Sequence, residues 1–142
     1  MIELRSPRHA LDWEAYHRIR RRILFELRGR GEEYDPNHPD EHLPGHHPKI
    51  LFEDQVAIAV IRIDLEPPDA IFRRVAVREE YQRRGYGTTL LKLAEEFARA
   101  HASSSIISFV DAEAVAFYRK CGFVAAELPA SPGTLPMRKL IK

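Results

Sequence analysis

The sequence lacks the features that would place it in several large classes of protein. Its single cysteine, Cys121, has no partner with which to form a disulfide inside the chain. The longest uninterrupted apolar run, residues 56–61, is far shorter than the roughly 20 residues that a membrane-spanning helix requires. Residues 1–5 contain no apolar stretch of signal-peptide length. We therefore expect a cytoplasmic protein without a membrane partner.

The chain also has little excess charge of either sign. Its 22 lysines and arginines against 21 acidic residues leave a net charge of +1. Non-specific nucleic-acid binding depends on a basic excess, so nucleic acid is not an expected partner. What is present is a core-forming composition, with 44% hydrophobic and 30% charged residues. This composition predicts one globular domain over residues 1–142.

Periodicity and loop signals predict the order of the elements. Apolar residues at four-residue steps from Leu11 to Leu27 predict an amphipathic helix over residues 10–27. Prolines and histidines predict irregular structure over residues 32–48. Three strands over 50–52, 56–65 and 70–77 are expected next, in an antiparallel meander. A helix over 86–102, a strand over 105–110 and a helix over 112–121, capped by Asp111, should follow. The last expected elements are strands over 123–128 and 135–141. This order predicts a mixed α/β fold in which helices cover one sheet.

The loop between the strand over 70–77 and the following helix carries the clearest chemistry. Gly85 and Gly87 have no Cβ atom, so the backbone can turn tightly and bring successive N–H groups close to a ligand. The first N–H groups of a helix have no intrahelical partner and lie at the positive end of its dipole, which favours phosphate oxygens. Residues 73–88 add five arginines and only two glutamates. The loop is therefore predicted to bind phosphate, although it is neither a P-loop nor a G-x-G-x-x-G loop.

Two motifs resemble those of the GNAT N-acetyltransferase superfamily. Residues 82–87, Gln-Arg-Arg-Gly-Tyr-Gly, are similar to the Gln/Arg-x-x-Gly-x-Gly/Ala signature whose loop holds the pyrophosphate of acetyl-coenzyme A. Residues 114–123 resemble the second motif, a short helix with a Phe-Tyr pair that ends in Gly-Phe. Residues 1–69 match by topology alone. The resemblance implies a GNAT-like central mixed, mostly antiparallel sheet of six to seven strands with splayed fourth and fifth strands, flanked by about four helices.

The resemblance also implies which residues bind acetyl-CoA. The pyrophosphate would be held by the loop, here Gln82, Arg83, Arg84, Gly85, Tyr86, Gly87 and Thr88. The free backbone of the splayed strand, at Val75, Ala76 and Val77, would pair with the pantetheine arm and polarise the thioester carbonyl. The Arg73-Arg74 doublet interrupts the alternation of this strand, which predicts a β-bulge and agrees with splaying.

The implied reaction is direct transfer of the acetyl group from acetyl-CoA to a primary amine, with no metal. Tyr118 matches the tyrosine that, in many members of the superfamily, protonates the departing thiolate of coenzyme A. Such an amine must first lose a proton, because a lysine-like amine has a pKa near 10.4. Members of the superfamily are often dimers, so a homodimer is one expectation.

The general base is where the resemblance fails. Some members, histone acetyltransferases among them, place a glutamate on the fourth strand, whereas residues 70–72 here read Ala-Ile-Phe. Glu79, Glu80, Asp111 and the histidines are candidates without positional support. This gap leaves open an alternative, a non-catalytic coenzyme-A-binding or regulatory module with the same fold.

Three further features have two interpretations each. The arginines at 18 and 20–22 fit a solvated helix face or a site for an anion or an acidic substrate, and a nucleic-acid binder would use them with the arginines of residues 73–84. His38, His42 and His46 recur every four residues, which suggests a metal, but prolines interrupt any helix that would align them. The resemblance implies that the region after the first helix lines the acceptor cleft, so acceptor binding by one of these histidines or His47 is the favoured interpretation. Cys121 is expected to be a small buried residue rather than a nucleophile.

Overall fold

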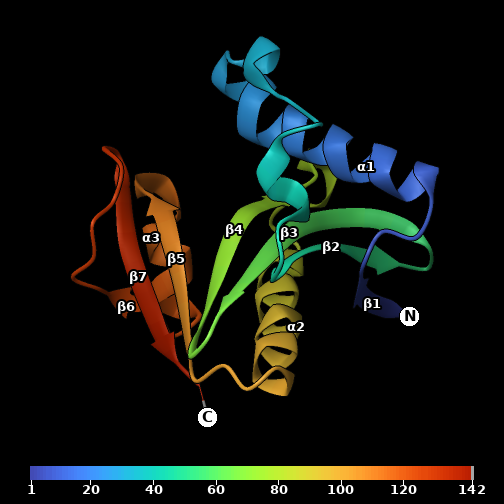
Figure 1. Cartoon of the computed structure of the whole chain (residues 1–142). Helices are drawn as coiled ribbons and strands as arrows, with labels where there is room; N and C mark the ends of the chain where they lie inside the picture. Colours follow the sequence, from blue (N-terminus) through green and yellow to red (C-terminus); the bar gives the residue numbers. More distant parts are fainter. Residues whose placement is uncertain (142) are drawn as a thin grey trace.

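A computed structural model describes residues 1–141 of the chain, which form one seven-stranded sheet with helices on both faces (Figure 1). The strands lie in the order β1-β2-β3-β4-β5-β7-β6. They are β1 (Ile2–Arg5), β2 (His46–Glu53), β3 (Val56–Glu66), β4 (Asp69–Val77), β5 (Ser105–Asp111), β6 (Val124–Ala125) and β7 (Thr134–Leu140). The α-helices are α1 (Ala10–Arg20), α2 (Tyr86–Ala100) and α3 (Val115–Lys120).

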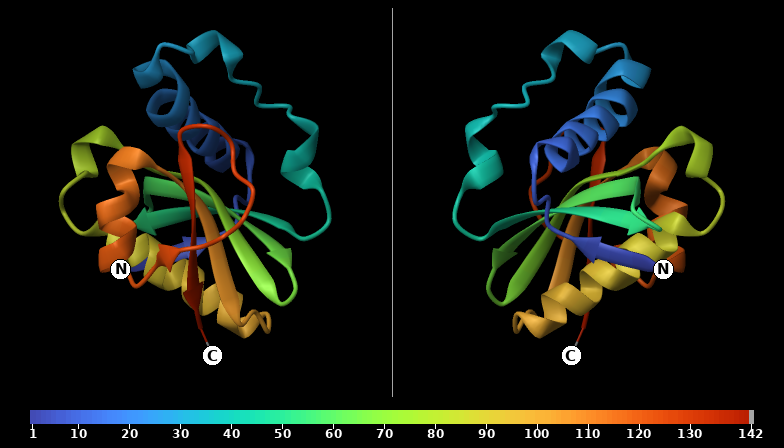
Figure 2. Two further views of the ribbon diagram at one scale, coloured as in Figure 1. Left: turned by 90° about the vertical axis from the view of Figure 1, so that its left-hand side faces the viewer. Right: turned by 90° about the vertical axis from the view of Figure 1, so that its right-hand side faces the viewer.

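The two faces of the sheet are covered by different helices. In Figure 2, α1 and α2 lie on opposite sides of the sheet. On the α2 face, Leu90 and Ala94 pack with Ile61 and Ile63 of β3 in the larger apolar cluster, which Tyr118 of α3 joins. The smaller cluster, on the α1 face, is formed by Tyr16, Ile19, Ile50, Phe52, Val60 and Ala76. Alternate residues of β3 therefore contribute to opposite faces, as strand geometry requires.

All strand pairs are antiparallel except β4 with β5, and this one parallel pair is short. Its register runs from Asp69 opposite Ser105 to Phe72 opposite Ser108. Beyond that point the strands have no mutual pairs in the described part of the chain, and Figure 1 shows them diverging. The splaying of β4 and β5 that the family resemblance implies is thus confirmed. We call the diverging ends, residues 73–77 of β4 and 109–111 of β5, the fork.

The β-bulge expected at the arginine doublet is also confirmed. Arg62 of β3 lies opposite Arg73, but Val60 lies opposite Ala76, so two residues of β4 face one residue of β3. Arg74 in the bulge has a left-handed φ of +57°, which is uncommon for a residue with a side chain. The bulge turns the end of β4 away from β5, and it brings Ala76 onto the α1 face.

The first helix differs from its prediction in length and in buried face. The α-helix ends at Arg20 and continues as a π-helical turn, η1 (Arg21–Phe25), and a 3-10 turn, η2 (Glu26–Arg28). Leu11 and Leu27 are exposed, whereas Asp12 and Tyr16 are buried. Ile19 of the apolar repeat is buried as predicted, but the buried face of α1 also carries the polar residues Asp12 and Arg20, which an apolar repeat cannot identify.

Four other expectations need correction. The structure has three α-helices rather than about four, because the segment after α1 forms only short turns. Residues 46–48, expected in a loop, belong to β2 because they pair with residues 62–64 of β3. The strand expected over 123–128 is limited to β6. Asp111 does not cap the helix after it, because its carboxylate pairs with Arg28 at 2.7 Å.

The mixed α/β class and the antiparallel meander β2-β3-β4 are confirmed. Within residues 1–141, the search for a helix both long and apolar enough to cross a lipid bilayer found no candidate.

Candidate active site

The loop after β4 presents a row of main-chain N–H groups without protein acceptors. Arg83 and Gly85 both have left-handed φ angles, +64° and +85°. Gly85 is the N-cap of α2, and the first helical hydrogen bond runs from the N–H of Thr89 to the carbonyl of Gly85, at 3.1 Å. In the described structure, the N–H groups of residues 83–88 donate to no protein oxygen. The loop therefore exposes unpaired donors at the positive end of α2.

The two glycines of this loop do different things. A Cβ atom on Gly85 would meet no heavy atom within 4 Å, so the space beside its backbone is open. A Cβ atom on Gly87 would lie 3.0 Å from Cζ of Phe117 on α3. Gly85 thus leaves room for a ligand beside the N–H groups, whereas Gly87 lets α3 approach the start of α2.

The side chains of the loop are of two kinds. Some are arginines without a carboxylate partner in the described chain, and others form hydrogen bonds that hold the loop in place. Arg83 and Arg84 have no carboxylate partner among residues 1–141, and Arg84 stacks over Tyr81 with 5.8 Å from Cζ to the ring centroid. Gln82 instead donates from Nε2 to the carbonyl of Val77, 2.9 Å away. Tyr86 donates its hydroxyl to Glu53 of β2. Gln82 and Tyr86, both expected in the cofactor site, therefore anchor the loop to the sheet.

The fork lies directly before this loop. The β5 side of residues 73–77 has no strand partner, so backbone groups there are available to a ligand. The side chains of Val75 and Val77 pack against the α2-face core, and Ala76 is buried on the opposite face. These contacts hold the unpaired edge in place, which is what a strand-like ligand needs to pair with it.

Tyr118 lies where the fork begins. It belongs to α3, is 6% exposed and packs between Phe117 and Phe123. Burial raises the pKa of Tyr118 to about 12, although the hydroxyl of the neighbouring Ser108 opposes the shift. Ser108 is in turn the β5 residue of the last β4–β5 pair. The tyrosine therefore stays protonated at neutral pH and is placed next to the first unpaired residues.

The carboxylates considered as the general base lie in different parts of the structure. Ile71, within the stretch of β4 that has no glutamate, lies opposite Asp64 of β3. Asp64 is 1% exposed, and its carboxylate accepts from Nε of Arg62 at 2.8 Å and Nε of Arg73 at 3.0 Å. Two guanidinium groups thus hold this carboxylate in an ion-pair network. Asp111 lies at the end of the β5 arm of the fork, paired with Arg28.

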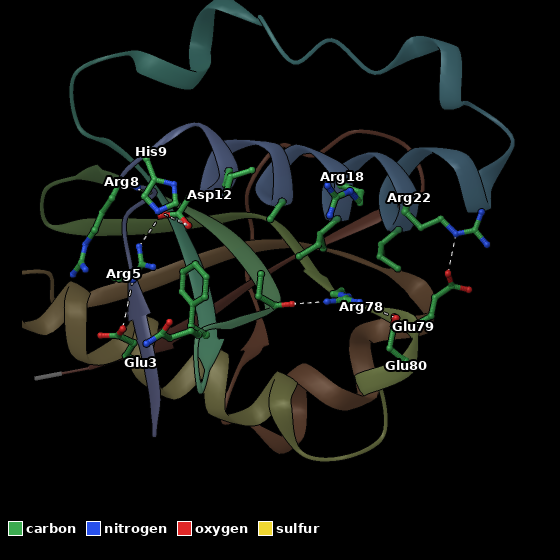
Figure 3. A pocket seen from close by; sticks show the side chains of 17 residues that line it. Glu3, Arg5, Arg8, His9, Asp12, Arg18, Arg22, Arg78, Glu79 and Glu80 are labelled. Carbon is green, nitrogen blue, oxygen red and sulfur yellow. Dashed lines mark hydrogen bonds and ion pairs between the residues drawn. The ribbon is translucent and has the colours of Figure 1, made fainter.

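Glu79 and Glu80 line a pocket of about 800 Å³ between α1 and strands β1–β3 (Figure 3). Glu79 pairs with Arg22 at 2.8 Å and Glu80 with Arg78 at 2.9 Å. The lining of this pocket includes none of residues 75–77, 82–88 or 118. This pocket is therefore separate from the fork and the loop.

The arginines at 18 and 20–22 do not form one basic patch. Arg18 pairs with Glu14, and Arg22 with Glu79 and Glu26. Arg20 is buried in an ion pair with Glu41, and it also donates to the hydroxyl of Tyr16. Arg21 stacks over Tyr34. The acids near three of these four side chains favour a structural role for them over binding of a polyanion.

The histidines of residues 38–47 have separate partners. His38 pairs with Asp40, and His46 lies 3.5 Å from Asp64. His42 contacts Trp13, and His47 contacts Phe97 and His101. Among the described residues there is no group of three or more His, Cys, Asp or Glu side chains able to hold a metal ion. Cys121 is half-buried, and burial raises the pKa of its thiol, which does not favour a nucleophile.

The fold is therefore of the mixed α/β class, with a forked sheet beside a helix start whose N–H groups are unpaired within the described chain. The sequence identifies the family. Residues 13–123 match the sequence profile of the Acetyltransferase (GNAT) family, and the chain belongs to that family.

Solved structures with the same fold support this assignment. An acyl-CoA N-acyltransferase from Pseudomonas aeruginosa superposes with a TM-score of 0.81 at 18% identity, over 98% of each chain. The PaiA N-acetyltransferase of Thermoplasma acidophilum, in complex with coenzyme A, gives 0.76 at 18% identity over 99% of each chain. The ribosomal-protein-S18-alanine N-acetyltransferase of Escherichia coli gives 0.76 at 19% identity, over 99% of this chain and 94% of that one. At these identities, the likeness is one of fold.

Proposed function

We propose that the protein is an acetyl-CoA-dependent N-acetyltransferase that transfers the acetyl group directly to a primary amine. The observation that carries the proposal is the row of unpaired N–H groups at residues 83–88, with open space beside Gly85, immediately after an unpaired strand edge. This combination suits a ligand with a diphosphate at one end and an extended amide-containing arm at the other. The family and the coenzyme A complex of a relative support the same ligand.

In this proposal the diphosphate of acetyl-CoA accepts hydrogen bonds from the N–H groups of residues 83–88. Arg83 and Arg84 add positive charge without a competing carboxylate. The pantetheine arm pairs with the free edge of residues 75–77, where one strand N–H polarises the thioester carbonyl. Gln82 and Tyr86 act by holding the loop against Val77 and Glu53.

The chemistry that acetyl-CoA supplies is a thioester with a good leaving group. The amine nitrogen attacks the acetyl carbonyl carbon, the carbon–sulfur bond breaks, and the nitrogen loses a proton to water or a base. Tyr118 gives a proton to the thiolate as it leaves. Its buried position at the start of the fork supports this role, and its pKa of about 12 keeps the hydroxyl protonated until the thiolate forms. No covalent enzyme intermediate is required.

The experiment measures binding and turnover separately. Calorimetry with acetyl-CoA and with coenzyme A tests the loop, and thiol release in the presence of a broad panel of amines tests catalysis. We expect both binding and amine-dependent thiol release. Binding without turnover on any amine would favour the alternative, a coenzyme-A-binding or regulatory module. Absence of binding would contradict the whole assignment.

A further inference from the structure

Arginines gather on the α1 face beside the fork, and not all of them are neutralised. Arg20 pairs with Glu41, and Arg62 and Arg73 share Asp64. Arg74, in the bulge itself, has no carboxylate partner within residues 1–141. The charged groups that surround it therefore leave a net positive charge at the point where β4 leaves the sheet.

A second unpaired cation lies close to Arg74. Both Arg30 and Arg74 place their guanidinium carbon near the ring of Phe25 in η1, at 5.7 and 5.8 Å from the centroid. Arg30 also lacks a carboxylate partner in the described chain. Two like charges that contact one ring repel each other, and an anion bound near them would reduce that cost. Both side chains are exposed and so accessible to a ligand.

Partial desolvation of Arg74 also favours the binding of an anion. Although the side chain keeps contact with solvent, burial of part of it lowers the pKa of Arg74, and the neighbouring Arg20 and Arg62 lower it further. Asp40 and Glu41 oppose this effect without reversing it. The guanidinium group thus lies where its charge is under-compensated, which is the setting in which a carboxylate binds with most gain.

The rest of this surface is apolar and aromatic. Ile71 and Ile107, the pair just before the last one between β4 and β5, are 7% and 6% exposed. Phe109 on the β5 arm lies 5.5 Å from the guanidinium carbon of Arg73. The surface that an acceptor must cross to reach the fork therefore combines apolar contacts with guanidinium groups, and the acids on it are already paired.

We propose that the acceptor amine belongs to a free amino acid, whose carboxylate is bound by Arg74 with help from Arg30. The inference rests on the function proposed above and names its acceptor class. Arg74 directly precedes Val75, so a carboxylate on its side chain places an amine a few bonds away near the free strand edge. The planar guanidinium group recognises a carboxylate through two parallel hydrogen bonds, whereas it repels a diamine that carries a second positive charge.

The test compares amines that differ only in the carboxylate, at saturating acetyl-CoA. Phenylalanine is set against phenylalaninamide and 2-phenylethylamine, and lysine against 1,5-diaminopentane. We expect kcat/KM to be at least about tenfold higher for each amino acid, the gain of one charge-assisted carboxylate contact. Equal or higher rates for the partners that lack the carboxylate would overturn the acceptor class and leave the acetyltransferase function standing. Absence of turnover with every amine would overturn that function, and this inference with it.

Variants show whether Arg74 carries the preference. Arg74→Gln should lose the preference for amino acids mainly through KM, and Arg74→Lys should retain part of it. Arg8→Gln is the matched control, because Arg8 is an exposed arginine that lines the separate pocket under α1. Coenzyme A affinity, measured for every variant, reports whether the fork is intact. A preference unchanged in Arg74→Gln, with normal coenzyme A affinity, would contradict the assignment.

Discussion

The two faces of the sheet are built from different interactions. On the α2 face, aliphatic side chains of α2, β3 and β5 form a continuous apolar core. On the α1 face, a small apolar cluster lies beside buried charged residues, including Arg20, Glu41, Arg62 and Asp64. Apolar burial is non-directional and tolerates small shifts, whereas ion pairs in a poorly solvated place require defined geometry.

Groups from both faces of the sheet meet at the fork. Tyr118 belongs to the α2 face, and the arginines belong to the α1 face. The apolar face holds the loop of residues 82–88 through Val77 and α2, and the charged face carries the groups that the proposed acceptor would contact. Stability and recognition are therefore expected to respond to different substitutions.

The largest effect is expected on the charged face, from Asp64→Asn. Loss of this carboxylate leaves Arg62 buried without its main partner, which should cost about 4 kcal/mol of unfolding free energy, measured in urea. Asp69→Asn is the control, because Asp69 lies half-buried at the start of β4 and should cost under about 0.5 kcal/mol. A loss below 1 kcal/mol for Asp64→Asn would mean that the network adds little to the stability of this face.

A slightly smaller effect is expected from a cavity on the apolar face. Leu90 of α2 is fully buried, so Leu90→Ala should cost about 3 kcal/mol of unfolding free energy. Leu11→Ala on α1 is the matched control, because Leu11 is 70% exposed and its truncation should have almost no effect. If the two variants unfolded at the same urea concentration, the assignment of the inner faces of these helices would be wrong.

Cofactor affinity should respond to the loop that joins the two faces. Gly85→Val introduces a β-branched side chain at φ +85° and fills the open space beside the N–H groups. The Kd for coenzyme A should rise about 100-fold, or about 2.7 kcal/mol, by calorimetry. Gly133→Val has a similar φ of +87° and equally open surroundings, so it shares the backbone strain without touching the loop. Equal losses of affinity in both variants would assign the effect to strain.

A moderate effect on turnover is expected from Tyr118→Phe. The ring keeps its contacts with Phe117 and Phe123, so stability and coenzyme A affinity should change little while kcat falls about 30-fold, or about 2 kcal/mol. Because the pKa of Tyr118 is about 12, its proton should remain in place from pH 7 to pH 10. The wild-type rate should therefore show no loss from tyrosine ionisation in that range. An unchanged kcat in the variant would assign protonation of the thiolate to water.

The smallest effect is expected on the unfolding free energy, from a substitution of Asp12 whose effect depends on pH. Burial alone would raise the pKa of Asp12, but the hydrogen bonds from Arg5 and from the N–H of Arg8 lower it below its usual value. A lowered pKa in the folded state stabilises the protein above the unfolded pKa of about 3.9, and this contribution disappears as the pH falls through the folded value. Asp12→Asn should thus cost about 1 kcal/mol at pH 7. The gap between variant and wild type should close below pH 4, and a gap that persists there would contradict the sign.

Much of the α2 side could be predicted from the sequence because its signals are local. The loop glycines, the helix that follows and the Gly-Phe motif are all read from neighbouring residues, as is the bulge at Arg73 and Arg74. The structure adds distinctions within the motif. Gly87 serves the packing of Phe117, and Gln82 holds the strand end, although the motif pattern gives both of them to the cofactor.

The α1 side could be predicted only in outline. Arg62 and Asp64 stand two residues apart in an apolar strand, a signal that both lie on one face, but their partners Arg73 and Asp40 are distant in the chain. The apolar repeat likewise places Ile19 but not Asp12 on the buried face of α1, because Asp12 is buried in an ion pair with Arg5 of β1. The unpaired state of Arg74 depends on which acids its neighbours have already engaged.

By itself, the sequence determined the order of most elements, the glycine loop before α2 and the family motifs, since hydrophobic period, glycine and helix starts act over a few residues. The tertiary structure alone decided which carboxylates are engaged, where β4 parts from β5, and which cations remain beside the fork. Charges act through space and through the dielectric around them, so their roles follow from the packed arrangement and not from their spacing along the chain.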